Sequence, residues 1–384
     1  MFKNPFSPIF GGKPGVFFGR DRILKLFDQA MIDTGSDDRA LFITGTRGSG
    51  KTALLEQLSI RAKNKNRIVI DLGPENTLLQ LEHFLIGHDE VTKTVSPGAS
   101  VNILGVGGSV SAGSVSRTDR IGSGNLQPLF LETCAGAKKG ILITIDEIQK
   151  VPIEDVSVIC NVYQMASRKG YDVMLAVAGL PYAYTKIIMY EGCTYLRRAS
   201  HEELGLFTWD ETDAALDNIF SGIKGLIIDK SYIDKMNQSS FGHPYLMQLL
   251  GYYLILQVND KNNDKKYNVT ENEVDEAVSN ALFSYEQRAL KPLLDELSNN
   301  ERTYLRSMSE CLNDDRLAMT ADIAHDMDAE QNKLSRTRAS LIDNGIIAAP
   351  ERGKVMFCIP YLADYVKKEE QTSDIISIAR QRRV

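Results

Sequence analysis

Short apolar runs alternate with helical patterns along the first half of the chain. The runs cover residues 40–45, 67–73, 141–147 and 171–179, and a fifth strand is expected at 202–207. Their nearly continuous apolar character is typical of strands that are buried on both faces of a sheet. A helical stripe, with Ile23 and Phe27 on one face, precedes the first run. The alternation predicts an α/β fold with a parallel sheet covered by helices on both faces.

The second half of the chain shows mainly helical patterns. Residues 208–220 open with a capping box, Thr208 and Glu211, and further helices are expected at 243–257 and 272–290. Three short helical patterns and two alternating runs joined by "ERGK" then predict a winged helix-turn-helix. We therefore predict an α/β core (1–207), a helical lid (208–297), a winged helix (298–370) and a tail (371–384).

Composition narrows the class of protein. At 384 residues, of which 43% are hydrophobic, the chain can form two or three domains. No window reaches the roughly 20 apolar residues that a bilayer span needs, so we expect a cytoplasmic protein with no membrane partner. The five cysteines are odd in number and far apart, which predicts reduced thiols and no metal cage. A net charge of −6 limits any nucleic-acid contact to a local patch.

Two segments leave their interpretation open. The Gly- and Ser-rich connection 97–124 is typical of a poorly ordered or hairpin-like insertion, and a functional role is the alternative. The segment "GTRGSGKT", between the first apolar run and a helical pattern, matches a phosphate-binding P-loop. A chance glycine-rich turn is the alternative reading of that segment.

The P-loop reading assigns a role to each residue of the segment. Glycines let the backbone turn so that successive N–H groups face phosphate oxygens, and the helix start adds its positive dipole end. Lys51 would neutralise the terminal phosphates, and the Thr52 hydroxyl would bind Mg²⁺. The predicted binding residues are Gly45, Thr46, Arg47, Gly48, Ser49, Gly50, Lys51 and Thr52.

A second motif, "ILITIDE", ends an apolar run in two carboxylates. Asp146 at the strand end is placed to hold magnesium, and Glu147 is placed to polarise a water for attack on the terminal phosphorus. Acid pairs at strand ends also occur as solvated turn starts. Together with the P-loop upstream, the motif favours a magnesium ligand at Asp146 and a catalytic base at Glu147.

Arg197 and Arg198 are candidates for a further cation at the reacting phosphate. Such an arginine is often supplied by a neighbouring subunit. The pair lies between the fourth and fifth expected strands. A solvated helix end or a salt-bridge donor is the alternative.

The order of these motifs resembles AAA+ ATPases of the origin-recognition type and the related STAND ATPases, over nearly the whole chain. "FFGRDRIL" looks like the family's N-terminal box, "GTRGSGKT" and "ITIDE" like Walker A and B, and "GHPYLMQLLG" like its lid motif. The resemblance implies ATP or ADP with Mg²⁺ as cofactors and a homo- or hetero-oligomer assembled through the nucleotide site. It also implies that Phe18, Gly19, Arg20, Pro244 and Tyr245 approach the base.

Two departures from the family pattern favour nucleotide binding over rapid hydrolysis. Many members carry a polar residue at the tip of the fourth strand, whereas this chain has Ala176, Val177, Ala178 and Gly179. Many also carry a lid arginine at the terminal phosphate, where this chain offers His243. We therefore expect a slow ATPase that works as a nucleotide-dependent switch.

The winged helix offers a possible contact with double-stranded DNA. Its expected recognition helix, 331–344, projects Lys333, Ser335, Arg336 and Ser340 away from its apolar side, and the wing tip carries Arg352 and Lys354. Residues 298–384 nevertheless hold thirteen Lys or Arg and fourteen Asp or Glu, a net charge of −1. A winged helix used for subunit packing or protein partners is therefore the alternative.

Three functional hypotheses follow from the sequence. The first is an ATP-binding and ATP-hydrolysing AAA+ protein that acts on DNA through its winged helix. The second is a STAND-like signalling switch whose winged helix makes protein contacts. The third is a transcription regulator that binds nucleotide only as a structural ligand.

Overall fold

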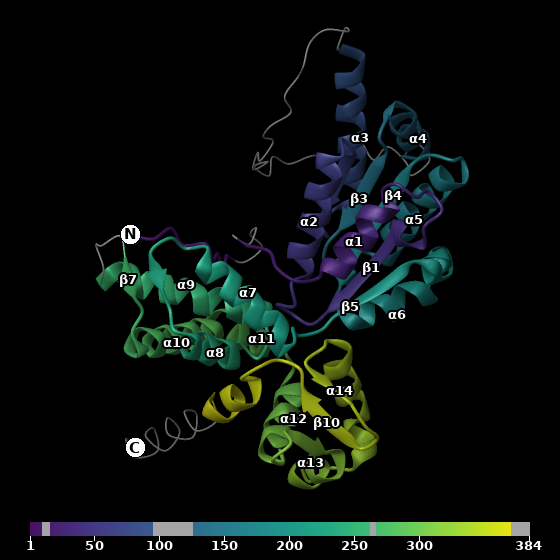
Figure 1. Cartoon of the computed structure of the whole chain (residues 1–384). Coiled ribbons are helices and arrows are strands. Elements are labelled where there is room, and N and C mark those ends of the chain that lie inside the picture. The colour runs from purple at the N-terminus through teal and green to yellow at the C-terminus, as the bar shows by residue number, and fades with distance from the viewer. Residues whose placement is uncertain (10–15, 95–125, 262–265, 370–384) are drawn as a thin grey trace, which may run out of the picture.

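A computed structural model describes residues 1–9, 16–94, 126–261 and 266–369. It consists of an α/β core, a group of helices beside the core, and a C-terminal winged helix beneath both (Figure 1). The connection 97–124 and the tail 371–384 lie outside the described residues. Within the described ranges, no helix has the length and apolar character needed to cross a membrane.

The core contains a five-stranded parallel sheet in the order β2-β3-β4-β1-β5. The five expected strands are present, with small differences at their ends. β3 and β4 are buried along their whole length because helices cover both faces of the sheet (Figure 1). The strands are β1 (Ala40–Gly45), β2 (Ile68–Leu72), β3 (Ile141–Ile145), β4 (Val173–Gly179) and β5 (Ser200–Leu204).

Alternate strand residues face the two helical layers. Phe42 and Ile143 belong to one buried cluster, whereas their neighbours Ile43 and Leu142 belong to another. Because both sets are apolar, the strands show no polar alternation in the sequence. The core helices are α1 (Asp21–Ala30), η1 (Asp37–Arg39), α2 (Lys51–Asn64), α3 (Thr77–Thr94), α4 (Leu126–Gly136), η2 (Ile148–Lys150), α5 (Ile153–Arg168), α6 (Pro181–Met189) and η3 (Glu191–Arg198).

The helices that follow Phe207 form the lid. The predicted capping box is present: the Thr208 hydroxyl accepts from the Glu211 N–H, and the Glu211 carboxylate accepts from the Thr208 N–H. The lid elements are α7 (Trp209–Ser221), β6 (Leu226–Ile227), α8 (Lys230–Ser240), α9 (Pro244–Lys261), β7 (Tyr267–Asn268), α10 (Glu271–Tyr285), η4 (Glu286–Leu290) and α11 (Lys291–Asp295).

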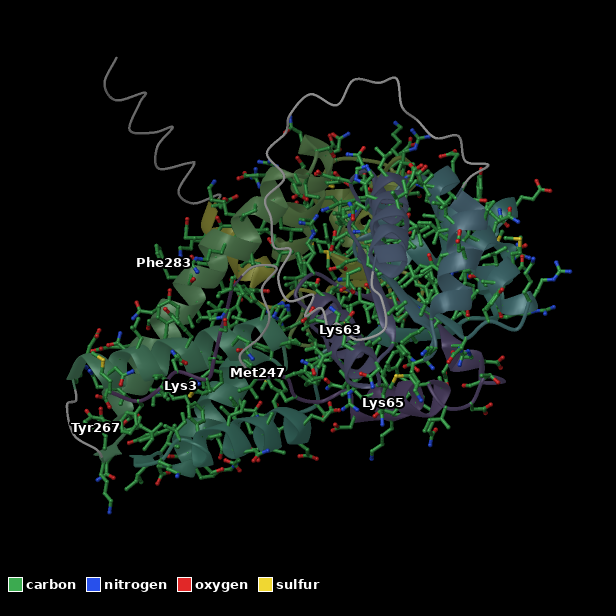
Figure 2. The ribbon with its side chains drawn as sticks, turned by 90° about the horizontal axis from the view of Figure 1, so that it is seen from above. Lys3, Lys63, Lys65, Met247, Tyr267 and Phe283 are labelled. Carbon is green, nitrogen blue, oxygen red and sulfur yellow. The ribbon has the colours of Figure 1, made fainter. Side chains whose placement is uncertain are left out.

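The N-terminal segment, residues 1–9, lies along α9 of the lid (Figure 2). Phe2 exchanges two hydrogen bonds with Asn259, at 2.6 and 3.0 Å. Phe6 is buried against Gly251, where an added Cβ would lie 2.3 Å from its ring. The first residues of the range predicted to form the core are therefore fixed to the lid.

The C-terminal region is a winged helix, as predicted, with one additional strand. Its elements are α12 (Asn299–Glu310), β8 (Leu317–Met319), α13 (Thr320–Asp326), α14 (Gln331–Asp343), β9 (Ile347–Ala348) and β10 (Lys354–Phe357). β8 pairs with β10 and makes the wing a three-stranded sheet. The Ser340 hydroxyl, on the side of α14 predicted to be polar, donates to Glu301 Oε1 at 2.7 Å.

The winged helix and the lid share a continuous apolar core. One cluster of buried residues extends from Leu250 of the lid to Leu341 and Val355 of the winged helix. The Tyr361 hydroxyl also donates to the Ser239 carbonyl at 2.8 Å. This close packing means that a movement of the lid would be transmitted to the winged helix. The boundaries at 207, 297 and 370 stay predictions.

Candidate functional site

The glycine-rich loop connects the end of β1 to the start of α2. Gly48 and Gly50 have φ values of 76° and 92°, a conformation that strains residues with a side chain. Gly45 is needed for a different reason, since a Cβ there would lie 2.8 Å from the Leu204 carbonyl oxygen. The loop thus places the first N–H groups of α2, which lack acceptors within the helix, at the carboxyl edge of the sheet.

Lys51 is buried at the base of this loop. Its ammonium donates to the carbonyl oxygens of Gly45 and Thr46, at 3.0 and 2.8 Å. Burial lowers the pKa of Lys51, and the nearby Glu147 and Asp146 carboxylates oppose that shift. Close by, the buried Ser49 hydroxyl has no hydrogen-bond partner among the described residues. A buried cation and an unsatisfied hydroxyl are what a phosphate-binding loop would present to its ligand.

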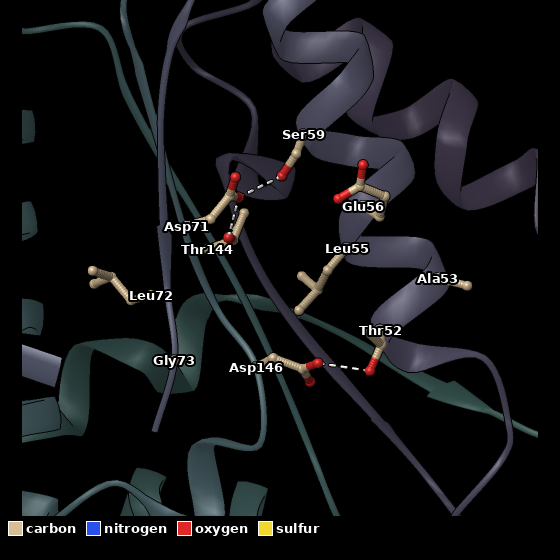
Figure 3. A pocket seen from close by; sticks show the side chains of 10 residues that line it. All are labelled: Thr52, Ala53, Leu55, Glu56, Ser59, Asp71, Leu72, Gly73, Thr144 and Asp146. Atoms are coloured by element: carbon tan, nitrogen blue, oxygen red, sulfur yellow. Dashed lines mark hydrogen bonds between the residues drawn. The ribbon is translucent and has the colours of Figure 1, made fainter. Parts of the chain in front are cut away.

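Thr52 and Asp146 come together at the end of β3, as the two motifs predict (Figure 3). The Thr52 hydroxyl donates to Asp146 Oδ2 at 2.6 Å, and Asp146 Oδ1 accepts from the Glu147 N–H at 2.8 Å. Hydroxyl and carboxylate oxygens are the donor set that Mg²⁺ prefers. The residues present therefore fit a magnesium ion.

A polar cavity of about 380 Å³ opens beside this pair, between α2 and the ends of β2 and β3 (Figure 3). Asp71 lines it and accepts hydrogen bonds from the Ser59 and Thr144 hydroxyls, each at 2.7 Å. Thr52 and Asp146 lie at its other end. The metal candidates are thus next to open space.

Glu147 lies just beyond Asp146 with a left-handed backbone, φ 49°. Its Oε2 accepts from Gln149 Nε2 at 2.7 Å and lies 3.2 Å from the Lys150 ammonium. Sequence reasoning did not single out Gln149. The one available signal was a long amide side chain two residues after the acid pair.

The lid contacts the P-loop through the "GHP" segment. Gly242 has φ 69°, and a Cβ there would lie 2.1 Å from the Phe207 carbonyl oxygen. This turn places His243 against the loop, with Nε2 3.2 Å from the Arg47 carbonyl oxygen. A Cβ at Gly48 would lie 2.4 Å from the His243 ring and 3.5 Å from Tyr245 Cβ. Pro244, the first residue of α9, follows directly.

His243 is neutral in this position. Nδ1 accepts from the Leu246 N–H at 3.4 Å, so the proton belongs on Nε2, which donates to Arg47. Burial lowers the pKa of His243 to about 4, and the nearby Lys51 ammonium acts in the same direction. The lid therefore presents an uncharged donor to the P-loop instead of an arginine.

The N-terminal box joins the core to the lid. Phe18 packs on Phe207 with ring centroids 5.3 Å apart, and the Arg20 guanidinium lies 4.3 Å from the centre of the Phe207 ring. Arg20 also donates to the Gly205 carbonyl at 2.5 Å. Gly19 has φ 69°, and a Cβ at this residue would lie only 2.6 Å from the Phe207 ring. Phe18, Gly19 and Arg20 are thus near the end of β5, which borders the P-loop through Leu204 and Gly45.

Arg197 and Arg198 do not take part in this cluster. Both are exposed at the end of η3, and Arg197 Nε donates to the Ile188 carbonyl at 2.9 Å. Among the described residues, neither arginine contacts the loop or Glu147. Their exposure is compatible with a role toward another subunit.

The winged helix and the end of α11 also contact the P-loop. A Cβ at Gly345, just after α14, would lie 3.2 Å from Thr46 Cγ2. Arg47 forms an ion pair of 2.5 Å with Glu296, at the end of α11. Burial, together with the carboxylates of Asp343 and Glu147, raises the pKa of Tyr182. The last turn of α14 thus lies near the acidic end of β3.

The predicted DNA-contact residues lie away from the loop. Lys333, Ser335 and Arg336 are exposed near the start of α14, and Arg352 is exposed at the wing tip. Lys333 lies 3.8 Å from Glu330 and Lys354 lies 2.8 Å from Glu351, so acidic neighbours partly offset both cations.

The comparisons with known proteins cover part of the chain by sequence and nearly all of it by structure. Residues 287–366 match the model of a domain of unknown function, DUF8462. No curated protein matches the chain. The chain is similar to the ORC2 protein of Aeropyrum pernix in its ADPNP and ADP complexes, at 14% identity and a TM-score of 0.59, with 93% of this chain and 94% of that chain covered.

Two further solved structures are similar. The ADP form of the same Aeropyrum pernix protein gives 14% identity and a TM-score of 0.52, over 92% of this chain and 93% of that one. Cdc6p from Pyrobaculum aerophilum gives 13% identity and a TM-score of 0.49, over 94% and 96%. The predicted resemblance is confirmed at the level of the fold: the chain has the fold of an AAA+ P-loop ATPase of the origin-recognition type, with a helical lid and a C-terminal winged helix.

Proposed function

We propose that the chain binds ATP and ADP with Mg²⁺ and hydrolyses ATP slowly. The observation that carries the proposal is the buried Lys51 at the base of a glycine-rich loop, beside the hydrogen-bonded pair of Thr52 and Asp146. A similar structure, the Aeropyrum pernix ORC2 protein, is described with ADPNP and ADP, which supports an adenine nucleotide.

Each residue of the site would have a separate role in phosphoryl transfer. Thr52 and Asp146 would hold Mg²⁺, which when bound neutralises charge on the phosphate oxygens. Lys51 adds a fixed positive charge in a buried position, where water screens it little. Glu147 orients a water and accepts its proton. The base would lie against Phe18, Gly19 and Arg20 on one side and Pro244 and Tyr245 on the other.

Hydrolysis needs one more cation, which we assign to Arg197 or Arg198 of a second subunit. Both are exposed, and neither contacts the chain's own loop among the described residues. This assignment predicts an oligomer assembled through the nucleotide site.

Calorimetry with Mg·ATP and Mg·ADP tests the binding step. We expect saturable heat with the natural chain and none with Lys51→Ala. Phosphate release tests the chemical step: Glu147→Gln should bind ATP normally but lose turnover. Absence of binding by the natural chain would refute the proposal.

Mixing two kinds of variant subunit tests whether the arginine acts on the site of a neighbouring subunit. Glu147→Gln subunits and Arg197→Ala/Arg198→Ala subunits should each be inactive alone, yet regain part of the turnover when mixed. No recovery, together with a monomer in light scattering with ATP, would refute the shared site.

We further propose that the winged helix binds double-stranded DNA in a nucleotide-dependent manner. The exposed Lys333 and Arg336 near the start of α14, with Arg352 on the wing, support a helix that enters the major groove. The contacts of Gly345 with Thr46 and of Glu296 with Arg47 give the nucleotide state a route to that helix.

Filter binding with and without ATP tests this part. Lys333→Ala/Arg336→Ala should weaken binding and lower the salt slope by about two, because each phosphate contact releases about one counterion. Lys138→Ala/Lys139→Ala, an exposed pair in the core, removes the same charge and should have little effect. If no salt-dependent binding is seen in either nucleotide state, the DNA part is wrong, and a switch that acts on protein partners is favoured.

A further inference from the structure

We propose that Gln149 is the positioning residue for Glu147 and supplies, at the end of β4, the polar group that β4 itself lacks. The inference deepens the proposed function and depends on it. The last residues of β4, Ala178 and Gly179, offer no polar side chain toward the reacting end of the sheet. Gln149 reaches that place from the neighbouring helix η2.

The amide of Gln149 connects two fixed points. Its Oε1 accepts from the Leu180 N–H, just after β4, at 3.1 Å, and its Nε2 donates to Glu147 Oε2 at 2.7 Å. The Leu180 N–H can only donate and an ionised carboxylate can only accept, so one amide orientation satisfies both ends. The carboxylate is thereby tied to the backbone at the end of β4.

The local sequence leaves room for this contact. A Cβ at Gly179 would lie 2.6 Å from Gln149 Oε1 and 2.8 Å from Ile148 Cγ2. The φ of Gly179 does not require glycine, because it does not lie in the left-handed range. The absence of a side chain at Gly179 is therefore explained by the close approach of Gln149 and its helix.

Glu147 needs such a partner because its backbone leaves the strand direction at this residue. Its φ of 49° turns the chain out of β3 into η2, and its N–H is held by Asp146. These contacts fix the main chain but leave the side-chain torsions free. The Gln149 amide fixes one carboxylate oxygen. Among the described residues the other oxygen, Oε1, accepts no hydrogen bond, so it can accept the proton of a water.

Lys150 is the alternative positioning group. Its ammonium lies 3.2 Å from the same Oε2, but its side chain is 62% exposed. An exposed lysine has many rotamers and contributes little fixed geometry. The amide of Gln149, in contrast, is held at both ends.

Steady-state ATPase kinetics test the assignment on the full-length chain. Turnover by the natural chain that is lost in Glu147→Gln first establishes the proposed function. We then expect Gln149→Ala to lower kcat by about 10- to 100-fold, with KM and the Kd for Mg·ATP changed less than about threefold. Gln238→Ala, an exposed glutamine of α8, is the control and should be unchanged.

Gln149→Glu provides a readout that a structural role alone would not move. It keeps the size of the side chain and the oxygen that accepts from the Leu180 N–H, but it replaces the amide group that donates to Glu147 Oε2 with an oxygen that cannot donate to an ionised carboxylate. It should therefore lower kcat at least as much as Gln149→Ala, with the Kd for Mg·ATP changed less than about threefold. Thermal unfolding of each variant confirms that it is folded.

The outcomes are distinguishable. A natural kcat in both folded Gln149 variants would overturn the assignment and leave the proposed function standing. A parallel loss of nucleotide binding in Gln149→Ala would also overturn it, because the residue would then act on the fold of the site. No turnover by the natural chain would refute the proposed function and this inference with it.

Discussion

Opening of the lid should become easier as the pH falls, because His243 is buried in its neutral form. The ring is 2% exposed, donates to the Arg47 carbonyl and accepts from the Leu246 N–H. A proton on Nδ1 would make it a donor that faces a second donor, the Leu246 N–H. When the lid separates from the P-loop, the ring meets water and can take up that proton freely.

The structure sets the size and sign of this effect. Burial lowers the pKa of His243 from 6.5 to about 4. The open form therefore binds more protons than the closed form between these values, and the closed form loses stability as the pH falls through this window. Between pH 8 and pH 5 the loss is about 2 kcal/mol, or about 30-fold in the opening equilibrium.

Hydrogen exchange measured by mass spectrometry can detect this opening. After correction for the intrinsic pH dependence of exchange, peptides from the start of α9 and from the P-loop should exchange up to about 30-fold faster at pH 5 than at pH 8. His243→Gln keeps a donor for the Arg47 carbonyl but cannot gain a proton, so its corrected exchange should be nearly independent of pH. The same pH dependence in both proteins would refute the role of His243.

Three further variants and one control test single features of the structure. Gly242→Ala should destabilise the lid by more than about 2 kcal/mol in thermal unfolding, because its Cβ would meet the Phe207 carbonyl; Gly353→Ala, with φ 79° and open space around it, should cost only about 1–2 kcal/mol of backbone strain. Asp172→Ala should cost about 3 kcal/mol, because it leaves two buried arginines without their counter-ion; a loss below 1 kcal/mol would contradict this. Ser49→Ala should leave the free protein as stable as before, since the hydroxyl is unpaired, but should reduce the stabilisation by Mg·ATP.

The Asp172 variant tests the ion pairs of Asp172 with Arg39 and Arg67, which lie at the amino end of β4, away from the P-loop. Burial alone would raise the pKa of Asp172. Hydrogen bonds from Arg67 and Arg39 outweigh burial and hold this pKa below its ordinary value. The ionised carboxylate therefore stabilises the folded chain at any pH above its ordinary pKa. This stabilisation is lost as the pH falls through the lowered pKa of the folded chain. Asp172→Asn should remove this acid dependence, which thermal unfolding between pH 3 and pH 6 would show.

Much of the core could be predicted from the sequence because its signals are local. Strands buried on both faces give apolar runs, and the P-loop combines glycines, a lysine and a threonine within eight residues. The meeting of Thr52 and Asp146 also follows from the sequence, since parallel strands bring their carboxyl ends to one edge. β8 was missed because a strand of three residues, "LAM", has no recognisable period.

The contacts made by His243 and Gly345, and the contact of Gln149 with the Leu180 N–H, could not be predicted, because each joins segments that are distant in the sequence. His243 is 196 residues from Arg47 in the sequence. Nothing in "GHPY" indicates that its histidine loses its charge against a carbonyl group. The hydrogen bond from the Ser340 hydroxyl to Glu301 could not be predicted for the same reason, since the two residues are 39 positions apart.

The apex of the P-loop is therefore a meeting point of three parts of the chain. Thr46 contacts Gly345 of the winged helix. The Arg47 guanidinium forms an ion pair with Glu296, and the Arg47 carbonyl accepts from His243. Gly48 packs against the His243 ring. If the N–H groups of this loop bind phosphate as proposed, a shift of the loop would also displace the lid, because Gly48 is packed so closely against the His243 ring that a Cβ there would lie 2.4 Å from it. A ligand that moves these residues must then shift the balance between closed and open lid by its difference in affinity for the two states.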